Sequence, residues 1–145
     1  MVARYETSIE VSINCKSINE DIWGEMYDLL FNYTNDLPRG KNDLFFNTDN
    51  TQVWVSPDKI FVKTLHSFST DTVIIYRNLM KYRVSDSPLI ALGVCNEKGK
   101  LLTPFIMDII VLLKANLPKV ILCKGYLHPE DWKESMMRLH DMGYL

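Results

Sequence analysis

Histidine and cysteine are the residues of this chain that could bind a metal or act as a nucleophile, and both are rare. The sequence has 145 residues, with three histidines and three cysteines. None of them has the His-x-x-x-His or Cys-x-x-Cys spacing that brings two ligands to one metal ion. The odd number of cysteines, each in an apolar strand-like run, argues against a disulfide framework and favours a reduced, intracellular setting. The residues are His66, His128, His140, Cys15, Cys95 and Cys123.

His128 is the histidine best placed to contribute to a binding site. It follows Tyr126 at the end of an apolar segment and precedes a helix that we expect to begin at Pro129. Ligands of α/β-type sheets bind beyond the carboxyl ends of strands. Tyr126 and His128 are therefore candidates for a cleft, although a surface position in a connecting segment is the more common environment for such a residue.

Sequence motifs of catalytic sites are absent. The chain contains no Gly-x-Ser-x-Gly elbow, no phosphate-binding loop and no dinucleotide fingerprint. Two carboxylate pairs, Glu20-Asp21 and Glu130-Asp131, stand at predicted helix starts, where the positive end of the helix dipole accounts for them. We assign no catalytic or metal-binding residue and no cofactor, and an enzyme is the less favoured class.

Two basic segments could contact phosphate groups. One alternates cations with tyrosine rings, a combination that suits phosphate contact and base stacking, and the other is a glycine-containing loop. The cations are Arg77, Lys81 and Arg83 in the first segment and Arg39 and Lys41 in the second. Because the net charge of the chain is −2, a solvated surface is the preferred interpretation, and nucleic acid is a partner that we retain but do not favour.

The elements that must position these residues follow from the spacing of apolar side chains. This spacing predicts an α+β fold, in which about three to four helices pack on a single mixed or antiparallel sheet of about five to six strands. A chain of this length suits one compact domain, which we expect to span residues 1–145.

The N-terminal part contains the clearest strand and helix signals. Apolar and polar residues alternate from residue 9 to residue 15, as in a strand with one face in the core. Ser17 and Glu20 have the spacing of a capping box, which predicts a helix from Ile18 to about Asn32. The residues expected to form its core stripe are Ile22, Trp23, Met26, Tyr27, Leu29, Leu30 and Tyr33.

The middle of the chain predicts a β-hairpin followed by an ambiguous segment. Residues 52–56 and 59–65 are strand-like and are separated by Pro57-Asp58. The segment from Thr72 to Val84 begins with β-branched residues and ends with good helix formers, so both structures remain open, and we favour a helix.

The C-terminal part contains the stretch around which we expect the fold to be organised. Residues 89–95 predict a strand. The helix from Pro104 to Asn116 is apolar almost all round, so it is either sandwiched within the domain or offers one face to another chain. Residues 119–124 are uniformly apolar between two lysines, which predicts a central strand. In the helix from Pro129 the expected core residues are Trp132, Met136 and Leu139, with Gly143 closing the helix.

The order strand, helix, strand, helix over residues 89–144, ending in Met142-Gly143-Tyr144, resembles the corresponding part of a GNAT acyltransferase. The resemblance implies a glycine-rich turn after the central strand, whose backbone N–H groups would hold the pyrophosphate of acetyl-CoA. Here that turn is Asn96-Glu-Lys-Gly-Lys100, with a single glycine, and Pro104 lacks a donor. A divergent acyl-CoA-dependent transferase is therefore the alternative function.

Without a catalytic signature, the sequence favours a non-enzymatic interaction module. It would be a small accessory or structural component, either cytosolic or of virus or phage type, that forms a homo-oligomer or binds a protein partner, because large apolar patches mark contacts between chains. The candidate contact residues on the hairpin and after it are Trp54, Phe61, Leu65 and Phe68. The first residues lack the apolar core of a signal peptide, and no apolar run is long enough to span a bilayer, so we expect a cytoplasmic protein without membrane contact.

Overall fold

The computed structural model of the chain describes residues 9–37, 51–65, 70–84, 88–92, 104–125 and 127–145. Within them it has one antiparallel sheet of six strands and four α-helices, which confirms the predicted α+β fold with a single sheet. The strands are β1 (Ile9–Ile13), β2 (Thr51–Val55), β3 (Lys59–Leu65), β4 (Thr70–Tyr76), β5 (Ile90–Leu92) and β6 (Ile121–Lys124). The helices are α1 (Glu20–Asp36), α2 (Met80–Val84), α3 (Pro104–Asn116) and α4 (Pro129–Asp141).

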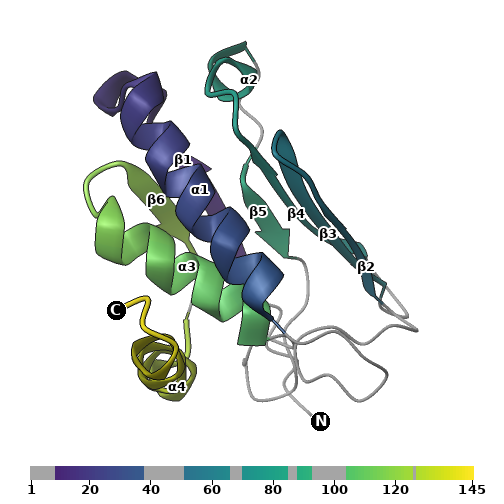
Figure 1. Cartoon of the computed structure of the whole chain (residues 1–145), viewed down its shortest axis with the longest axis vertical. Helices are drawn as coiled ribbons and strands as arrows, with labels where there is room; N and C mark the ends of the chain where they lie inside the picture. The colour runs from purple at the N-terminus through teal and green to yellow at the C-terminus, as the bar shows by residue number, and fades with distance from the viewer. Residues whose placement is uncertain (1–8, 38–50, 66–69, 85–87, 93–103, 126) are drawn as a thin grey trace, which may run out of the picture.

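The sheet and the helices form separate layers. Helices α1 and α3 lie on one face of the sheet, α4 packs against α3, and α2 lies at the end of β4 (Figure 1). The strand order is β2-β3-β4-β5-β1-β6. One face of the sheet is therefore covered by helices, and no helix of the described residues lies on the other.

The covered face is built from alternate residues that pair from strand to strand. One row runs through Val62, Val73, Ile90 and Val11 in neighbouring strands, and each of these side chains is at most 1% exposed. Such β-branched residues pack well on a pleated surface. Full burial of each contributes about 1.5–3 kcal/mol.

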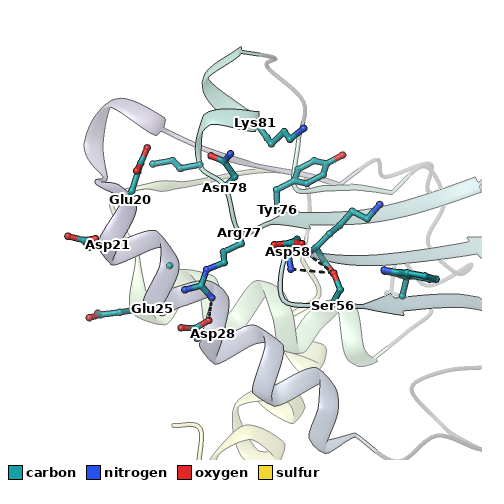
Figure 2. Close-up of a pocket in the computed structure, with 14 residues that line it drawn as sticks. Glu20, Asp21, Glu25, Asp28, Ser56, Asp58, Tyr76, Arg77, Asn78 and Lys81 are labelled. Atoms are coloured by element: carbon teal, nitrogen blue, oxygen red, sulfur yellow. Dashed lines mark hydrogen bonds and ion pairs between the residues drawn. The ribbon is translucent and has the colours of Figure 1, made fainter.

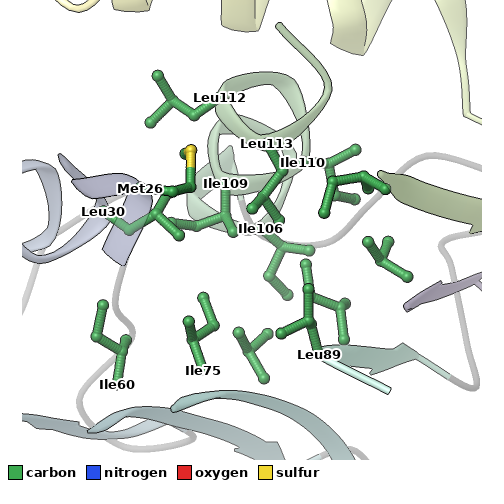
Figure 3. Packing of buried hydrophobic residues seen from close by; sticks show 14 of the residues in the cluster. Met26, Leu30, Ile60, Ile75, Leu89, Ile106, Ile109, Ile110, Leu112 and Leu113 are labelled. Atoms are coloured by element: carbon green, nitrogen blue, oxygen red, sulfur yellow. The ribbon is translucent and has the colours of Figure 1, made fainter. Parts of the chain in front are cut away.

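Helix α3 is the centre of the core. Every residue from Phe105 to Leu113 is buried, and Ile106 and Ile109 point toward Ile75 of the sheet (Figure 3). Helices α1 and α4 contact its other sides. The prediction of a buried helix is confirmed, and it is sandwiched within the chain. The alternative, that one face of α3 is exposed for contact with another chain, is wrong.

The C-terminal strand has a different place from the predicted one. Within the described residues β6 pairs with β1 alone, so it is an edge strand, and the expected central position of residues 119–124 is wrong. The reason is that Leu122 faces away from the helices and is 51% exposed. The uninterrupted apolar run reflects an apolar residue on the uncovered face, not burial on both faces.

Strand β1 lies between β5 and β6 and is antiparallel to both. The unit β5-α3-β6 is consequently a crossover whose two parallel strands are separated by a third, the split βαβ arrangement. The strand predicted for residues 89–95 is observed from Ile90 to Leu92. Leu89 is buried but precedes the strand, and residues 93–95 lie outside the described residues.

Helix α1 begins two residues later than the predicted start. Ser17 lies in a 3-10 turn and Ile18 is extended, so the cap is Asn19, whose side chain accepts a hydrogen bond of 2.9 Å from the backbone N–H of Ile22. Glu20 is then the first helical residue and cannot complete a capping box. The shifted helix leaves Ile22 exposed, whereas the other expected core residues are buried or partly buried.

Residues 72–84 are not one helix, and that preference is wrong. The β-branched stretch from Thr72 to Ile75 extends β4 and pairs with β3, as expected of its strand propensity. Only the last five residues, Met80–Val84, are helical. The predicted hairpin, by contrast, is confirmed as the antiparallel pair β2-β3.

Helix α4 begins at Pro129 as predicted, and Gly143 follows it with φ of 86°. That backbone conformation favours glycine. Leu139 is buried and Trp132 is partly buried, but Met136 is exposed and the buried residue on its turn is Ser135. A polar residue is buried at this position because the hydroxyl of Ser135 donates a hydrogen bond to the carboxylate of Asp108 in α3.

Candidate functional site

The side of the sheet on which no described helix lies, called the open face below, consists of the strand residues that alternate with buried ones. Its side chains are exposed or only partly buried. They are Glu10, Ser12, Trp54, Lys59, Phe61, Lys63, Thr72, Ile74, Tyr76, Ala91, Leu122 and Lys124. An antiparallel sheet in water normally has a polar outer face. This one mixes aromatic, aliphatic and charged residues, which makes it the first candidate for a binding surface.

An apolar row crosses the open face at one end. Trp54 of β2 is paired with Phe61 of β3, and Phe61 with Ile74 of β4. Trp54 is 63% exposed, although it is one of the largest side chains. Directly opposed residues have Cβ atoms about 4.5–5.5 Å apart, so the three side chains form one contiguous patch.

The row beside it is polar. It joins Lys63, Thr72, Ala91, Glu10 and Lys124 in register across five neighbouring strands, from β3 to β6. Lys63 stands at one end and Glu10 and Lys124 at the other, and the two residues between these charges, Thr72 and Ala91, are small. The open face thus has charges on both sides of a shallow centre.

Of the four hairpin-region residues expected to contact a partner, the structure places Trp54 and Phe61 together on the open face. Leu65 ends β3, but its side chain, like the whole of Phe68, lies outside the described residues. Lysines stand over two rings of this face. The Nζ of Lys59 lies 5.9 Å from the ring centre of Phe61, and that of Lys81 lies 5.8 Å from the ring centre of Tyr76.

A groove of about 1340 Å³ adjoins the open face. One wall is the exposed side of α1, with Glu20, Asp21, Glu25 and Asp28, and the other is formed by the β2-β3 turn and the connection from β4 to α2 (Figure 2). Trp54 also lines it. The groove is thus continuous with the apolar row.

Buried aromatic side chains of α1 attach the second wall of this groove to the helix by hydrogen bonds to backbone carbonyls. Trp23 donates through Nε1 to the carbonyl of Tyr76 over 2.8 Å, and the hydroxyl of Tyr27 donates to the carbonyl of Ser56 over 2.6 Å. Burial and, less strongly, the charge of Asp58 raise the pKa of Tyr27 to about 12. Tyr27 therefore remains a hydrogen-bond donor at neutral pH.

Of the cations in the first basic segment, Arg77 directly follows β4, and Lys81 and Arg83 both lie in α2. Arg77 forms an ion pair with Asp28 across the groove (Figure 2), and Arg83 lies 3.9 Å from a carboxylate oxygen of Glu20. Both carboxylates belong to α1. Arg77 and Arg83 thus face acidic groups of the same chain, which reduces the positive potential available for a phosphate. Arg39 and Lys41 lie outside the described residues.

His128, the candidate cleft residue, is the cap of α4. Its Nδ1 accepts a hydrogen bond of 3.3 Å from the backbone N–H of Glu130. Helix capping therefore accounts for a histidine at that position. Tyr126 lies outside the described residues.

Nearby Cys123 is half-buried, and burial raises the pKa of its thiol although the charge of Lys114 acts in the opposite direction. A thiol in that state is a poor nucleophile at neutral pH.

The most connected polar cluster in the described residues lies in the helix layer. Asp108 of α3 is fully buried and accepts hydrogen bonds from Tyr33 of α1 and from Ser135 and Arg138 of α4. The Nε of Arg138 is 3.0 Å from Oδ2 of Asp108. In the sequence, Asp108 is the one polar residue between Phe105 and Leu113. Its partners come from helices far away in the chain.

The electrostatics of this cluster favour its present charge state. Burial, followed by the charge of Asp108, raises the pKa of Tyr33. Burial lowers the pKa of Arg138, but its hydrogen bonds to Asp108 and the charge of that residue outweigh this, so the net shift is upward. Every oxygen of Asp108 is bonded within the protein. We therefore assign the cluster to holding three helices together.

The remaining observations add no chemistry. In the part of the chain that is described, no group of three or more His, Cys, Asp or Glu residues could hold a metal ion. The turn at residues 96–100, on which the GNAT resemblance depends, lies outside that part. Among the described residues, no helix has both the length and the apolar character needed to cross a bilayer. No family model, no curated protein and no solved structure matches the chain.

Proposed function

We propose that the chain is a non-catalytic protein-binding module whose binding surface is the open face of the sheet. The observation that carries this proposal is the exposed Trp54, in register with Phe61 and Ile74 on a sheet face that no described helix covers. Tryptophan and other aromatic residues are enriched at the centres of protein interfaces.

The physical argument is the amount of apolar surface that Trp54 exposes. A tryptophan side chain buries roughly 150–250 Å² on full enclosure, and each Å² contributes about 25 cal/mol. Covering Trp54, which is 63% exposed, would contribute on the order of 3 kcal/mol. Mutations on the open face are thus expected to alter association far more than folding.

The proposed role is that of a small accessory or structural component, either cytosolic or of virus or phage type, acting inside the cell. The thiol of Cys123 forms no disulfide, which suits a reducing compartment. The apolar helix α3, which suggested association from sequence, no longer supports this proposal because it is covered within the chain. The support comes from Trp54 and Phe61.

The test compares Trp54→Ala and Phe61→Ala with Met137→Ala. Met137 is a matched control because it is 60% exposed on α4. Self-association is measured by sedimentation equilibrium up to millimolar concentration, and heterologous partners by quantitative mass spectrometry of proteins retained on immobilised chain. We expect the two open-face variants to weaken association by about 30-fold with unchanged circular dichroism. If both variants associate as strongly as the Met137→Ala control, the proposal is wrong.

A further inference from the structure

We infer that the open face binds a second copy of the chain, stacked on the first about a two-fold axis that runs along the strands between β4 and β5. This inference rests on the proposed function and names the partner. It is carried by the order of charges in the first four members of the polar row, Lys63-Thr72-Ala91-Glu10. The fifth member, Lys124, then lies over β2 of the partner copy. Two copies of a chain most often pair through such a self-complementary surface.

The axis reverses the row in the partner copy. Lys63 lies on β3 and Glu10 on β1, one strand beyond β4 on one side and one strand beyond β5 on the other. A two-fold axis midway between β4 and β5 therefore places Lys63 of one copy over Glu10 of the other, twice. Two opposite-charge contacts result from one surface, as the symmetry of an isologous interface requires.

The other symmetric way to stack the two faces gives repulsion. A two-fold axis across the strands, through this row, would place Lys63 over the same lysine of the partner copy. It would likewise place Glu10 over the same glutamate. Like charges in direct opposition cost several kcal/mol in an interface. The order of charges thus selects the axis along the strands.

The centre of the row allows two sheets to approach each other. Thr72 and Ala91, the residues nearest the axis, are small and exchange places across it. Packed sheets lie about 10 Å apart with strands within about 30° of each other. Neighbouring strands are about 4.8 Å apart, so Lys63 and Glu10 each lie about 7 Å from the axis. An angle of about 30° between the two sheets then shifts Lys63 by only about 4 Å from the position directly over Glu10 of the partner copy. A lysine side chain is long enough to span that distance.

The apolar row follows the same symmetry. Trp54 lies on the edge strand β2, and the same axis brings it over the opposite edge strand β6 of the partner, where Leu122 is exposed. A hollow of about 1100 Å³ opens beside Leu122 and is lined by Glu10 and Ser12 as well. A protruding tryptophan thus meets a recess with an exposed leucine. Both exposed apolar residues of the described edge strands are covered by one arrangement.

The test exchanges the charges between chains. Glu10→Lys makes both contacts repulsive in its own homodimer, and so does Lys63→Glu, so each variant alone should dimerise about 10- to 100-fold more weakly than the unchanged chain. A mixture of the two variants restores both opposite-charge contacts in a heterodimer. Sedimentation equilibrium of each variant and of the equimolar mixture, together with native mass spectrometry, measures these states.

The matched controls are Lys133→Glu and Glu134→Lys, which reverse exposed charges on α4. These variants, and their mixture, should dimerise like the unchanged chain. A thermal melt of each variant establishes that the fold is retained. The inference is supported by weakened single variants whose mixture regains the dimer.

Three results overturn the inference, and they separate it from the proposed function. If the unchanged chain stays monomeric at millimolar concentration, the second copy is excluded while Trp54-dependent binding of another protein can still be tested. If Trp54→Ala weakens the dimer but the charge variants do not, this axis is wrong and the open face remains the surface. If neither Trp54→Ala nor the charge variants affect the dimer, both proposals are wrong.

Discussion

Ile74 and Ile75 are neighbours in β4, and their side chains lie on opposite faces of the sheet. Ile75 is fully buried beside Ile60 under the helices, whereas Ile74 is partly exposed beside Phe61 on the open face. The two residues have the same side chain and the same strand propensity. What differs is the layer above them. Residues of the covered face are therefore expected to determine stability, and those of the open face to determine association.

The same contrast exists between two aspartate–arginine pairs. Asp108 and Arg138 meet in the helix layer with the carboxylate fully buried, while Asp28 and Arg77 meet at the groove with each side chain about half exposed. Burial makes the loss of one partner costly because the other charge is left without solvent. At the groove, water replaces a lost partner.

The largest predicted effect is the removal of Arg138. In Arg138→Met the carboxylate of Asp108 stays buried without its cation, and we expect a loss of about 4–5 kcal/mol in the free energy of unfolding. Asp108→Asn should cost less, about 3 kcal/mol, because Arg138 is 26% exposed and can still reach water. Urea unfolding measures both losses. If Asp108→Asn cost more than Arg138→Met, this account of the cluster would be contradicted.

The adjacent isoleucines test the comparison of the two faces directly. Ile75→Ala removes fully buried methylene and methyl groups and leaves a cavity, which should cost about 2–5 kcal/mol. Ile74→Ala changes a partly exposed residue and should cost less than about 1 kcal/mol. Equilibrium unfolding of the two variants, at a concentration below that of any self-association, provides the measurement. Equal losses would show that the open face is covered in solution even in the monomer.

The elements of the fold were predictable where their signals are local. Alternation from residue 9, the hairpin around Pro57-Asp58 and the apolar run from Pro104 each depend on neighbours in the sequence, and each is observed. The order of the strands depends on distant pairs, such as Ile9 with Leu92 and Val11 with Cys123. No local pattern specifies those pairs, so residues 119–124 were wrongly placed at the centre of the sheet.

The candidate surface was predictable only in part for the same reason. Trp54 and Phe61 could be assigned to an outward face of the hairpin from alternation alone. Their alignment with Ile74 depends on the pairing of β3 with β4, in a segment for which a helix was favoured. The charge row that joins Lys63 to Glu10 requires pairing across four strands, β3, β4, β5 and β1. Such long-range order is absent from any short window of sequence.

A smaller effect is expected from the hydroxyl of Tyr27. Its pKa is raised from 10.0 to about 12 by burial and by the charge of Asp58, so its contribution to stability is complete below pH 10 and is lost as the pH rises toward 12. In Tyr27→Phe the stability at neutral pH should fall by about 1 kcal/mol, because the carbonyl of Ser56 loses its donor. The free energy of unfolding, measured between neutral pH and pH 12, should then fall less steeply with pH in the variant than in the unchanged chain. An unchanged alkaline slope would contradict this assignment.

The smallest predicted effect is at the pair of Arg77 and Asp28, and it completes the comparison with Arg138. Arg77→Met should change the free energy of unfolding by less than about 1 kcal/mol, because both partners are half exposed and salt screens their attraction. Added salt should reduce the difference between this variant and the unchanged chain, whereas the loss in Arg138→Met should persist, since the carboxylate of Asp108 is fully buried. Parallel urea titrations at low and high salt distinguish the two. A salt-independent loss at Arg77 would mean that the guanidinium stabilises the groove through its contact with the ring of Tyr27, whose centre lies 6.0 Å away.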